Sequence, residues 1–185
     1  MKYTISLFLS LLIMANALAQ TDKTDSTSSR GFAIRFLFDG FRPSGGLGAK
    51  LWISETSAMA LSLTGRSDKD AQPGYSNLLQ TISLIIDYEK HWPISKDLNL
   101  FGLATTSIAY LRSQYIHDNS IYSSDRREWM PALGVGWGAE YWVTDRISFS
   151  ASQSINYRYR YSIDENRHSS SGYVAVSYLL VSVYF

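Results

Sequence analysis

Residues 147–160 read ISFSASQSINYRYR, and two kinds of side chain alternate along this stretch. The even positions hold only serine, asparagine and arginine. Apart from Gln153, the odd positions hold the apolar and aromatic residues Ile147, Phe149, Ala151, Ile155, Tyr157 and Tyr159. Alternation with a period of two is typical of a β-strand whose two faces meet different surroundings. The stretch therefore predicts a strand with one apolar face and one polar face.

Seven further runs of the same kind surround it, which gives eight predicted strands. They are residues 31–39, 45–53, 58–66, 79–91, 98–112, 129–142 and 172–185. The run 98–112 alternates poorly, so its register stays open. No stretch beyond residue 30 has helical periodicity or 18 consecutive apolar residues. We therefore predict an all-β protein, an eight-stranded antiparallel up-and-down transmembrane β-barrel.

The connections between these runs fall into two classes. Three are short and polar, at 54–57, 93–97 and 143–146, and they alternate with the long polar segments 67–78, 113–128 and 161–171. Short turns at one end and long loops at the other are typical of outer-membrane barrels. An even number of strands then puts both ends of the barrel on the short-turn side, which is periplasmic in that architecture.

A tryptophan precedes each short turn: Trp52, Trp92 and Trp142. Tryptophan is enriched where lipid meets water, so the three residues predict one membrane boundary. By the alternation, Trp92 belongs to the apolar face, whereas Trp52 and Trp142 belong to the polar face. We expect Trp92 at the lipid boundary and the other two at the periplasmic mouth of the barrel.

The polar face is predicted to point into the barrel, because a membrane barrel turns its apolar face to lipid. The interior would then contain the charged residues Arg35, Lys50, Asp87, Glu89, Glu140, Arg158 and Arg160. Buried charges need partners, so we expect an interior network of salt bridges. Gly134, Gly136 and Gly138 share this face and would make room for large neighbours such as arginine. An eight-stranded barrel is just filled by side chains, so no open pore is expected.

The N-terminus precedes the barrel and has features of an export signal. Lys2 comes before a short apolar stretch, and Ala17-Leu18-Ala19 is a small-x-small cleavage site. Residues 20–30 contain almost only polar side chains and predict a flexible periplasmic segment. The predicted organisation is a signal peptide at 1–19, a flexible segment at 20–30 and the barrel at 31–185. The expected location is the cell outer membrane.

Composition excludes several classes of function. The 17 basic and 16 acidic residues nearly cancel, which argues against nucleic-acid binding by phosphate neutralisation. The chain has no cysteine, so disulfides and thiolate zinc sites are absent. The histidines His91, His117 and His168 show no metal-ligand spacing. We therefore predict no cofactor-binding residues, no metal site and no catalytic residues.

Some residues nevertheless have the composition of a chemical or recognition site. His168, Ser169 and Ser170, with Asp164 and Glu165, combine a base, a nucleophile and acids, but no pattern fixes their geometry. His91, beside Trp92 at a turn, is expected to be an interface residue. The long segments contain residues typical of recognition surfaces, where tyrosine supplies contact area. These are Tyr75, Tyr115, Tyr122, Tyr161, Arg126 and Arg127.

The eight runs, the repeated Trp-turn phrase and the terminal Tyr184-Phe185 resemble the small OmpA/OmpX-type outer-membrane barrels. The segment from Glu140 to Ser148, EYWVTDRIS, resembles the barrel-domain proteins of Bacteroidetes-type bacteria. The resemblance implies that the terminal Phe185 is read by the barrel-assembly machinery. It also implies contact with outer-membrane lipid and lipopolysaccharide.

The expected role is structural or adhesive, or one of binding a partner through the segments 67–78, 113–128 and 161–171. Two alternatives remain open. One is an outer-membrane lipid-modifying enzyme, because the His168–Ser169–Ser170 composition is similar to the His/Ser pairs of lipid A deacylases. The other is a soluble secreted barrel that binds an apolar ligand.

Overall fold

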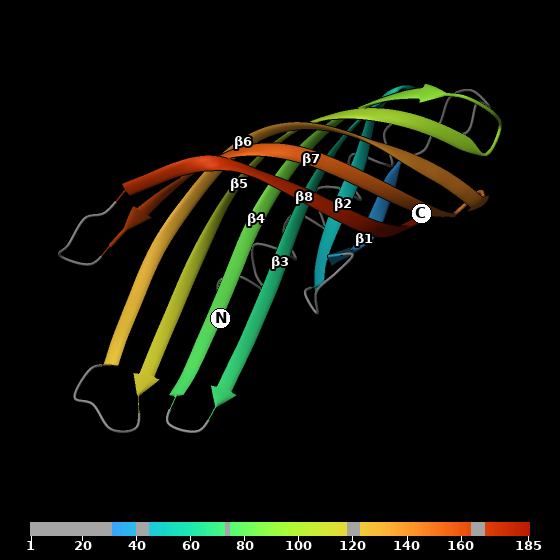
Figure 1. The fold of residues 1–185 in the computed structure, drawn as a ribbon. Helices are drawn as coiled ribbons and strands as arrows, with labels where there is room; N and C mark the ends of the chain where they lie inside the picture. The colour runs from blue at the N-terminus through green and yellow to red at the C-terminus, as the bar shows by residue number, and fades with distance from the viewer. Residues whose placement is uncertain (1–30, 40–44, 73–74, 118–122, 164–168) are drawn as a thin grey trace.

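The computed structural model describes residues 31–39, 45–72, 75–117, 123–163 and 169–185, which form eight antiparallel strands (Figure 1). They are β1 (Phe32–Asp39), β2 (Gly45–Ser54), β3 (Ser57–Gln72), β4 (Tyr75–Pro93), β5 (Leu98–His117), β6 (Ser123–Thr144), β7 (Ile147–Ser162) and β8 (Ser169–Tyr184). Each strand pairs with its neighbours in the sequence, and β8 pairs with β1. The predicted eight-stranded up-and-down barrel is confirmed. The signal peptide at 1–19 and the segment 20–30 lie outside the described residues.

The outer face of the barrel is apolar and most of its inner face is polar. Leu133 and Val135 are 68% and 67% exposed on the outside, while Arg35, Lys50 and Glu140 are buried inside. β5, which alternates poorly in the sequence, points Leu100 and Ile108 outward and Asn99 and Phe101 inward. In a water-soluble protein the apolar side chains would be buried instead. The predicted direction of the two faces is thus confirmed.

The segments 67–78 and 113–128 are largely strand in their described residues, so the prediction of long polar loops was wrong for these two. In the segment 161–171, residues 161–162 and 169–171 are strand, and residues 164–168 lie outside the described part of the chain. β3 and β4 pair up to Gln72 and Tyr75, and β5 and β6 pair up to Ile116 and Ser123. The reason is physical. Beyond the apolar part of the barrel's outer face, both faces of a strand meet polar surroundings. The alternation of apolar and polar side chains therefore ends there, although the backbone hydrogen bonds between the strands continue.

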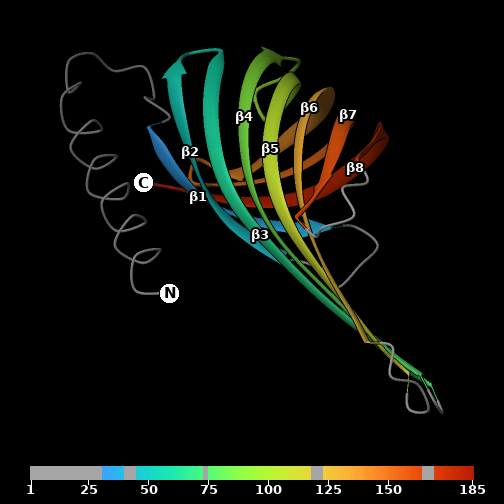
Figure 2. The ribbon, with the colours of Figure 1, turned by 90° about the vertical axis from the view of Figure 1, so that its left-hand side faces the viewer.

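This continued pairing builds a four-stranded sheet that extends past the barrel (Figures 1 and 2). We call it the protruding sheet; it consists of residues 66–72, 75–81, 111–117 and 123–128. In both views it extends well beyond the ends of β1 and β2. The described residues contain no helix that could span a membrane.

The β1–β2 hairpin is short, and this leaves a gap in the wall of the barrel. The last residue of β1 to pair with β8 is Asp39, opposite Tyr178. The first residue of β2 to pair with β3 is Gly45, opposite Gly65. Among the described residues, β3 from Arg66 onward and β8 before Tyr178 therefore have no strand between them. We call this gap the lateral opening.

Candidate functional site

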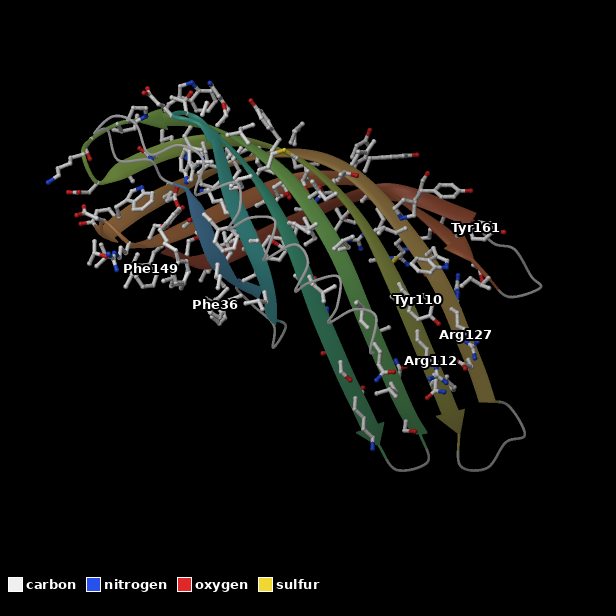
Figure 3. The ribbon with its side chains drawn as sticks, turned by 180° about the vertical axis from the view of Figure 1, so that it is seen from behind. Phe36, Tyr110, Arg112, Arg127, Phe149 and Tyr161 are labelled. Carbon is white, nitrogen blue, oxygen red and sulfur yellow. The ribbon has the colours of Figure 1, made fainter. Side chains whose placement is uncertain are left out.

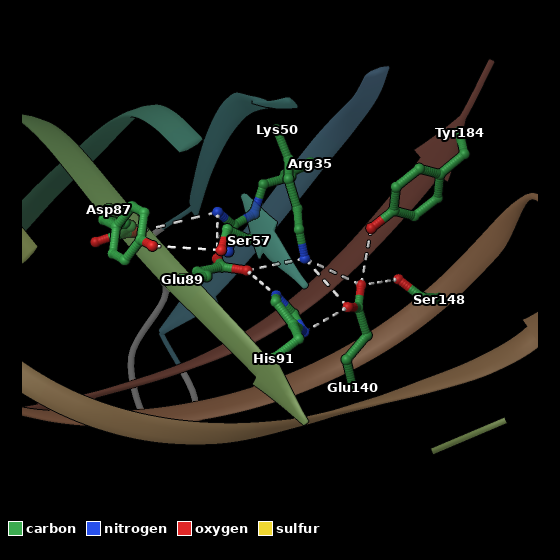
Figure 4. Close-up of polar contacts among 10 residues, drawn as sticks. Arg35, Lys50, Ser57, Asp87, Glu89, His91, Glu140, Ser148 and Tyr184 are labelled. Atoms are coloured by element: carbon green, nitrogen blue, oxygen red, sulfur yellow. Dashed lines mark hydrogen bonds and ion pairs between the residues drawn. The ribbon is translucent and has the colours of Figure 1, made fainter. Parts of the chain in front are cut away.

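A network of charged side chains fills the interior near the short-turn end (Figure 4). Arg35 lies 3.0 Å from Glu89 and 3.9 Å from Asp87. Lys50 lies 2.8 Å from Glu89 and 3.1 Å from Glu140. The network confirms the predicted interior salt bridges for these five residues. The other two predicted members, Arg158 and Arg160, line a cavity farther along the barrel.

Glu140 is fully buried and is the member of this network with the most varied partners. Its carboxylate accepts hydrogen bonds from Ser148 at 2.7 Å, Tyr184 at 2.8 Å and Lys50 at 3.1 Å. These partners come from β7, β8 and β2. A single carboxylate thus connects four strands across the lumen, because a buried charge is stable only when its oxygens are paired.

His91 belongs to the same network, so its predicted place as an interface residue at a turn was wrong. Its Nε2 atom lies 3.0 Å from Glu89 and its Nδ1 atom 3.6 Å from Glu140. His91 is on β4 two positions after Glu89, so both side chains point to the same face. This two-residue spacing was the signal in the sequence that could have placed His91 inside.

An aromatic layer lies beside the network. The ring centroids of Trp52 and His91 are 4.5 Å apart, those of His91 and Phe101 are 5.1 Å apart, and those of Trp142 and Tyr184 are 4.5 Å apart. Trp92 is 53% exposed on the outside. The predicted division of the tryptophans, with Trp92 outward and the other two at the mouth, is confirmed. Network and aromatic layer together fill the lumen at this end.

The glycines of β6 point inward as predicted, but the neighbours they accommodate are not arginines. A side chain at Gly138 would collide with the Phe101 ring, 2.8 Å from its Cε1 atom. One at Gly134 would meet Asn156 Cγ at 2.7 Å, and one at Gly136 would meet Ser154 Cβ at 2.8 Å. The glycines therefore let the aromatic layer and β7 approach β6 closely.

On the outer side of the protruding sheet, two arginines hold one carboxylate. Arg112 donates two hydrogen bonds to Asp125, at 3.1 and 3.0 Å, and Arg127 donates one at 3.1 Å. These hydrogen bonds, first of all those from Arg112, lower the pKa of Asp125 to about 2. Arg112 and Arg127 are labelled in Figure 3, farther from the short turns than the aromatic residue Tyr110.

We predict that the Asp125 carboxyl titrates near pH 2 in the folded barrel, against ~3.9 for an unperturbed aspartate. A depressed pKa in the folded state stabilises the protein above ~pH 4, and this contribution is lost as the pH falls to about 2. NMR titration of the aspartate carboxyl carbons in detergent micelles measures it. Arg112→Gln should move the midpoint toward ~3.9, whereas Arg146→Gln should not. A wild-type midpoint near ~3.9 would contradict the ion-pair geometry.

The other residues predicted as candidates are scattered. Arg126 pairs with Glu128 at 2.5 Å on the inner side of the protruding sheet, and Tyr161 is exposed near the end of β7. The backbones of Tyr75, Tyr115 and His117 lie in β4 and β5. Tyr122, Asp164, Glu165 and His168 lie outside the described residues. Within the described part of the chain, no group of His, Cys, Asp or Glu could hold a metal ion.

Comparison with known proteins supports the fold. No family model and no curated protein matches the sequence. Among solved structures, a major outer membrane protein from Thermus thermophilus superimposes with a TM-score of 0.59 at 14% identity, covering 83% of this chain and 98% of that chain. Neisserial surface protein A gives a TM-score of 0.51 at 18% identity, covering 83% and 93%. The chain has the fold of the small OmpA/OmpX-type outer-membrane barrels.

Proposed function

We propose that the chain is an integral barrel of the outer membrane, without an open pore, whose role is structural or adhesive. The observation that carries this proposal is the outward apolar belt. On β6 alone, Leu133, Val135 and Trp137 are each more than half exposed. Such a continuous apolar surface is unstable in water and fits contact with lipid.

Aromatic side chains border the belt at both ends. Trp92 and Tyr141 are exposed toward the short turns, and Tyr110 packs on Trp129 toward the protruding sheet, with ring centroids 5.2 Å apart. Tyr157 and Tyr173 form a second pair, at 5.3 Å. Two aromatic girdles around an apolar band are typical of barrels that cross the outer membrane. The proposed orientation puts the short turns in the periplasm and the protruding sheet outside the cell.

The proposed partners follow from the chemistry of the protruding sheet. Arg112 and Arg127 lie on its outer side just past the aromatic girdle, where phosphate groups of outer-leaflet lipopolysaccharide would be found. Arginine pairs well with phosphate. Farther out, the side chains of Tyr115 and Arg126 are exposed. We propose these as the contact surface for an extracellular partner.

Cell fractionation and gel migration test the membrane location directly. The chain should be recovered in the outer-membrane fraction and should migrate faster on a detergent gel before heating than after heating, as a folded barrel does. Recovery in the periplasm without detergent would contradict the proposal and favour the soluble secreted barrel.

The C-terminal residue gives a further prediction. Phe185 is 74% exposed, its backbone N–H donates to the Phe32 carbonyl at 3.0 Å, and its ring lies 6.4 Å from that of Phe32. It contributes little to the interior, so its deletion should leave the folded barrel stable in vitro but reduce insertion in cells several-fold. Surface labelling and fractionation measure insertion; in-vitro refolding is the control. Normal insertion of the truncated chain would contradict recognition of Phe185 by the assembly machinery.

A further inference from the structure

We propose that the lateral opening binds a phosphate-bearing lipid of the outer leaflet, with one acyl chain inside the barrel and the phosphate on Arg158 and Arg160. This inference rests on the proposed outer-membrane location. It differs from the contact surfaces above, because the site is a cavity inside the wall of the barrel.

The first observation is the height of the opening. β1 has eight residues, Phe32–Asp39, whereas a tilted strand needs ~9–11 to cross the hydrocarbon layer. The residues that the structure describes in β1 therefore end inside the lipid layer, on the side of the protruding sheet. The unpaired edges of β3 and β8 begin at that height. As the described strands define it, the opening lies at the height of the acyl chains of the outer leaflet.

The second observation is a cavity of about 520 Å³ at this place. Its lining includes Gly65, the last residue of β3 that pairs with β2, and Ala175 on the edge of β8, and both positions face outward. The same cavity reaches Met130 and Arg158 inside the barrel. It is thus continuous from the lumen to the lipid-facing surface. Its volume lies within the ~300–1,000 Å³ typical of ligand pockets, and suits one chain rather than a whole multi-chain lipid.

The third observation is that the cavity wall has an apolar part beside a polar part that contains Thr64, Thr81 and Ser83. Six large apolar side chains line it, from β1, β4, β5, β6 and β8: Leu37, Leu79, Leu111, Met130, Val174 and Val176. An apolar wall inside a water-filled lumen is unfavourable. An acyl chain that enters through the opening would cover it.

The fourth observation is a pair of cations for which the described part of the chain offers no carboxylate partner. Arg158 and Arg160 occupy successive inward positions of β7 and line the cavity. Among the described residues, neither has a carboxylate within 4.0 Å, whereas nearby Arg66 pairs with Asp68 and Arg126 pairs with Glu128. Two neighbouring guanidinium groups of like charge are best stabilised by an anion, and phosphate accepts two hydrogen bonds from each in a fork geometry.

The test measures binding of n-dodecyl phosphate to the full-length mature barrel in a neutral detergent, by calorimetry and by native mass spectrometry. Two variants probe the two halves of the site. Arg158→Gln with Arg160→Gln removes the cations. Gly65→Trp fills the opening, where an added side chain meets no atom within 4 Å and so should not disturb folding. The matched control is Lys96→Gln with Arg146→Gln, which removes the same charge at the short turns.

Wild type and control should bind one dodecyl phosphate, and each test variant should bind at least tenfold more weakly. Inorganic phosphate and dodecyl maltoside should not compete with dodecyl phosphate for the site. Inorganic phosphate lacks the alkyl chain, and dodecyl maltoside lacks the phosphate. Equal binding by the double arginine variant, equal binding by Gly65→Trp, or equal affinity for laurate would overturn the inference.

Each preparation is also run on a heat-modifiability gel. A barrel that is heat-modifiable but does not bind overturns this inference alone; a chain that never forms the barrel overturns the proposed function as well.

Discussion

Replacing Lys50 with methionine should lower the free energy of unfolding of the barrel by about 3–5 kcal/mol. Lys50 is 1% exposed and is ion-paired with Glu89 and Glu140 at 2.8 and 3.1 Å. Its removal leaves the buried carboxylates of Glu89 and Glu140 and the partly exposed one of Asp87, with Arg35 as the only remaining lysine or arginine of the network. An unpaired buried charge costs far more than the ion pair itself contributes. Urea unfolding in lipid vesicles, followed by tryptophan fluorescence, measures the loss.

A second change should recover most of this loss. Adding Glu140→Gln to Lys50→Met removes the carboxylate that lost its cation, so the double variant should be more stable than the single one. The control is Lys90→Met. Lys90 lies near the same turns but donates to Thr56 at the surface, at 2.7 Å, and its replacement should change stability by no more than ~0.5 kcal/mol. A double variant as unstable as the single one would show that packing, and not charge balance, sets the cost.

Replacing Val135 with arginine should cost about 2–4 kcal/mol in a bilayer. Val135 is 67% exposed and lies midway along the outward face of β6, between Tyr141 and Trp129. In a soluble protein such an exposed position would tolerate arginine within ~0.5 kcal/mol. The expected loss therefore comes from the lipid alone, because the guanidinium group must leave water at mid-membrane.

Ser67→Arg is the matched control, since Ser67 is exposed on the outer face of the protruding sheet. It should leave the free energy of unfolding within ~0.5 kcal/mol of wild type. Vesicle unfolding of both variants, compared at equal lipid concentration, is the measurement. Equal stability of Val135→Arg and Ser67→Arg would mean that the belt does not face hydrocarbon.

The sequence predicts the strands and their faces well, because the alternation of apolar and polar side chains follows from the different surroundings of a strand's two faces, lipid outside and the polar lumen inside. The odd or even position of a residue within its strand was enough to assign five charged residues to one interior network: Arg35, Lys50, Asp87, Glu89 and Glu140. Alternation fails where both faces meet water, so the sequence predicts loops for the paired strand residues from Ser67 to Gln72 and from Ser113 to His117. Their pairing depends on backbone hydrogen bonds, which leave no pattern in the side chains.

Contacts across the lumen were harder to predict. Gly138 makes room for Phe101 on the adjacent strand, and which residue lies opposite depends on a register that β5 does not reveal in its sequence. The lateral opening was not predicted either. It follows from a difference in strand length between β1 and β3, and the ends of strands are the least certain part of a sequence-based assignment.

The short pairing of β1 with β8 has a consequence for the order in which the barrel forms and comes apart. Only seven residue pairs join these two strands, from Ala33 opposite Tyr184 to Asp39 opposite Tyr178, although they come from opposite ends of the chain. Every other pair of strands is a local hairpin that closes a short loop, while this pair must close nearly the whole barrel. We therefore expect the pairing of β1 with β8 to form last during folding and to break first during unfolding. Amide exchange at Leu37 should therefore be faster than at Ile85, in the middle of β4.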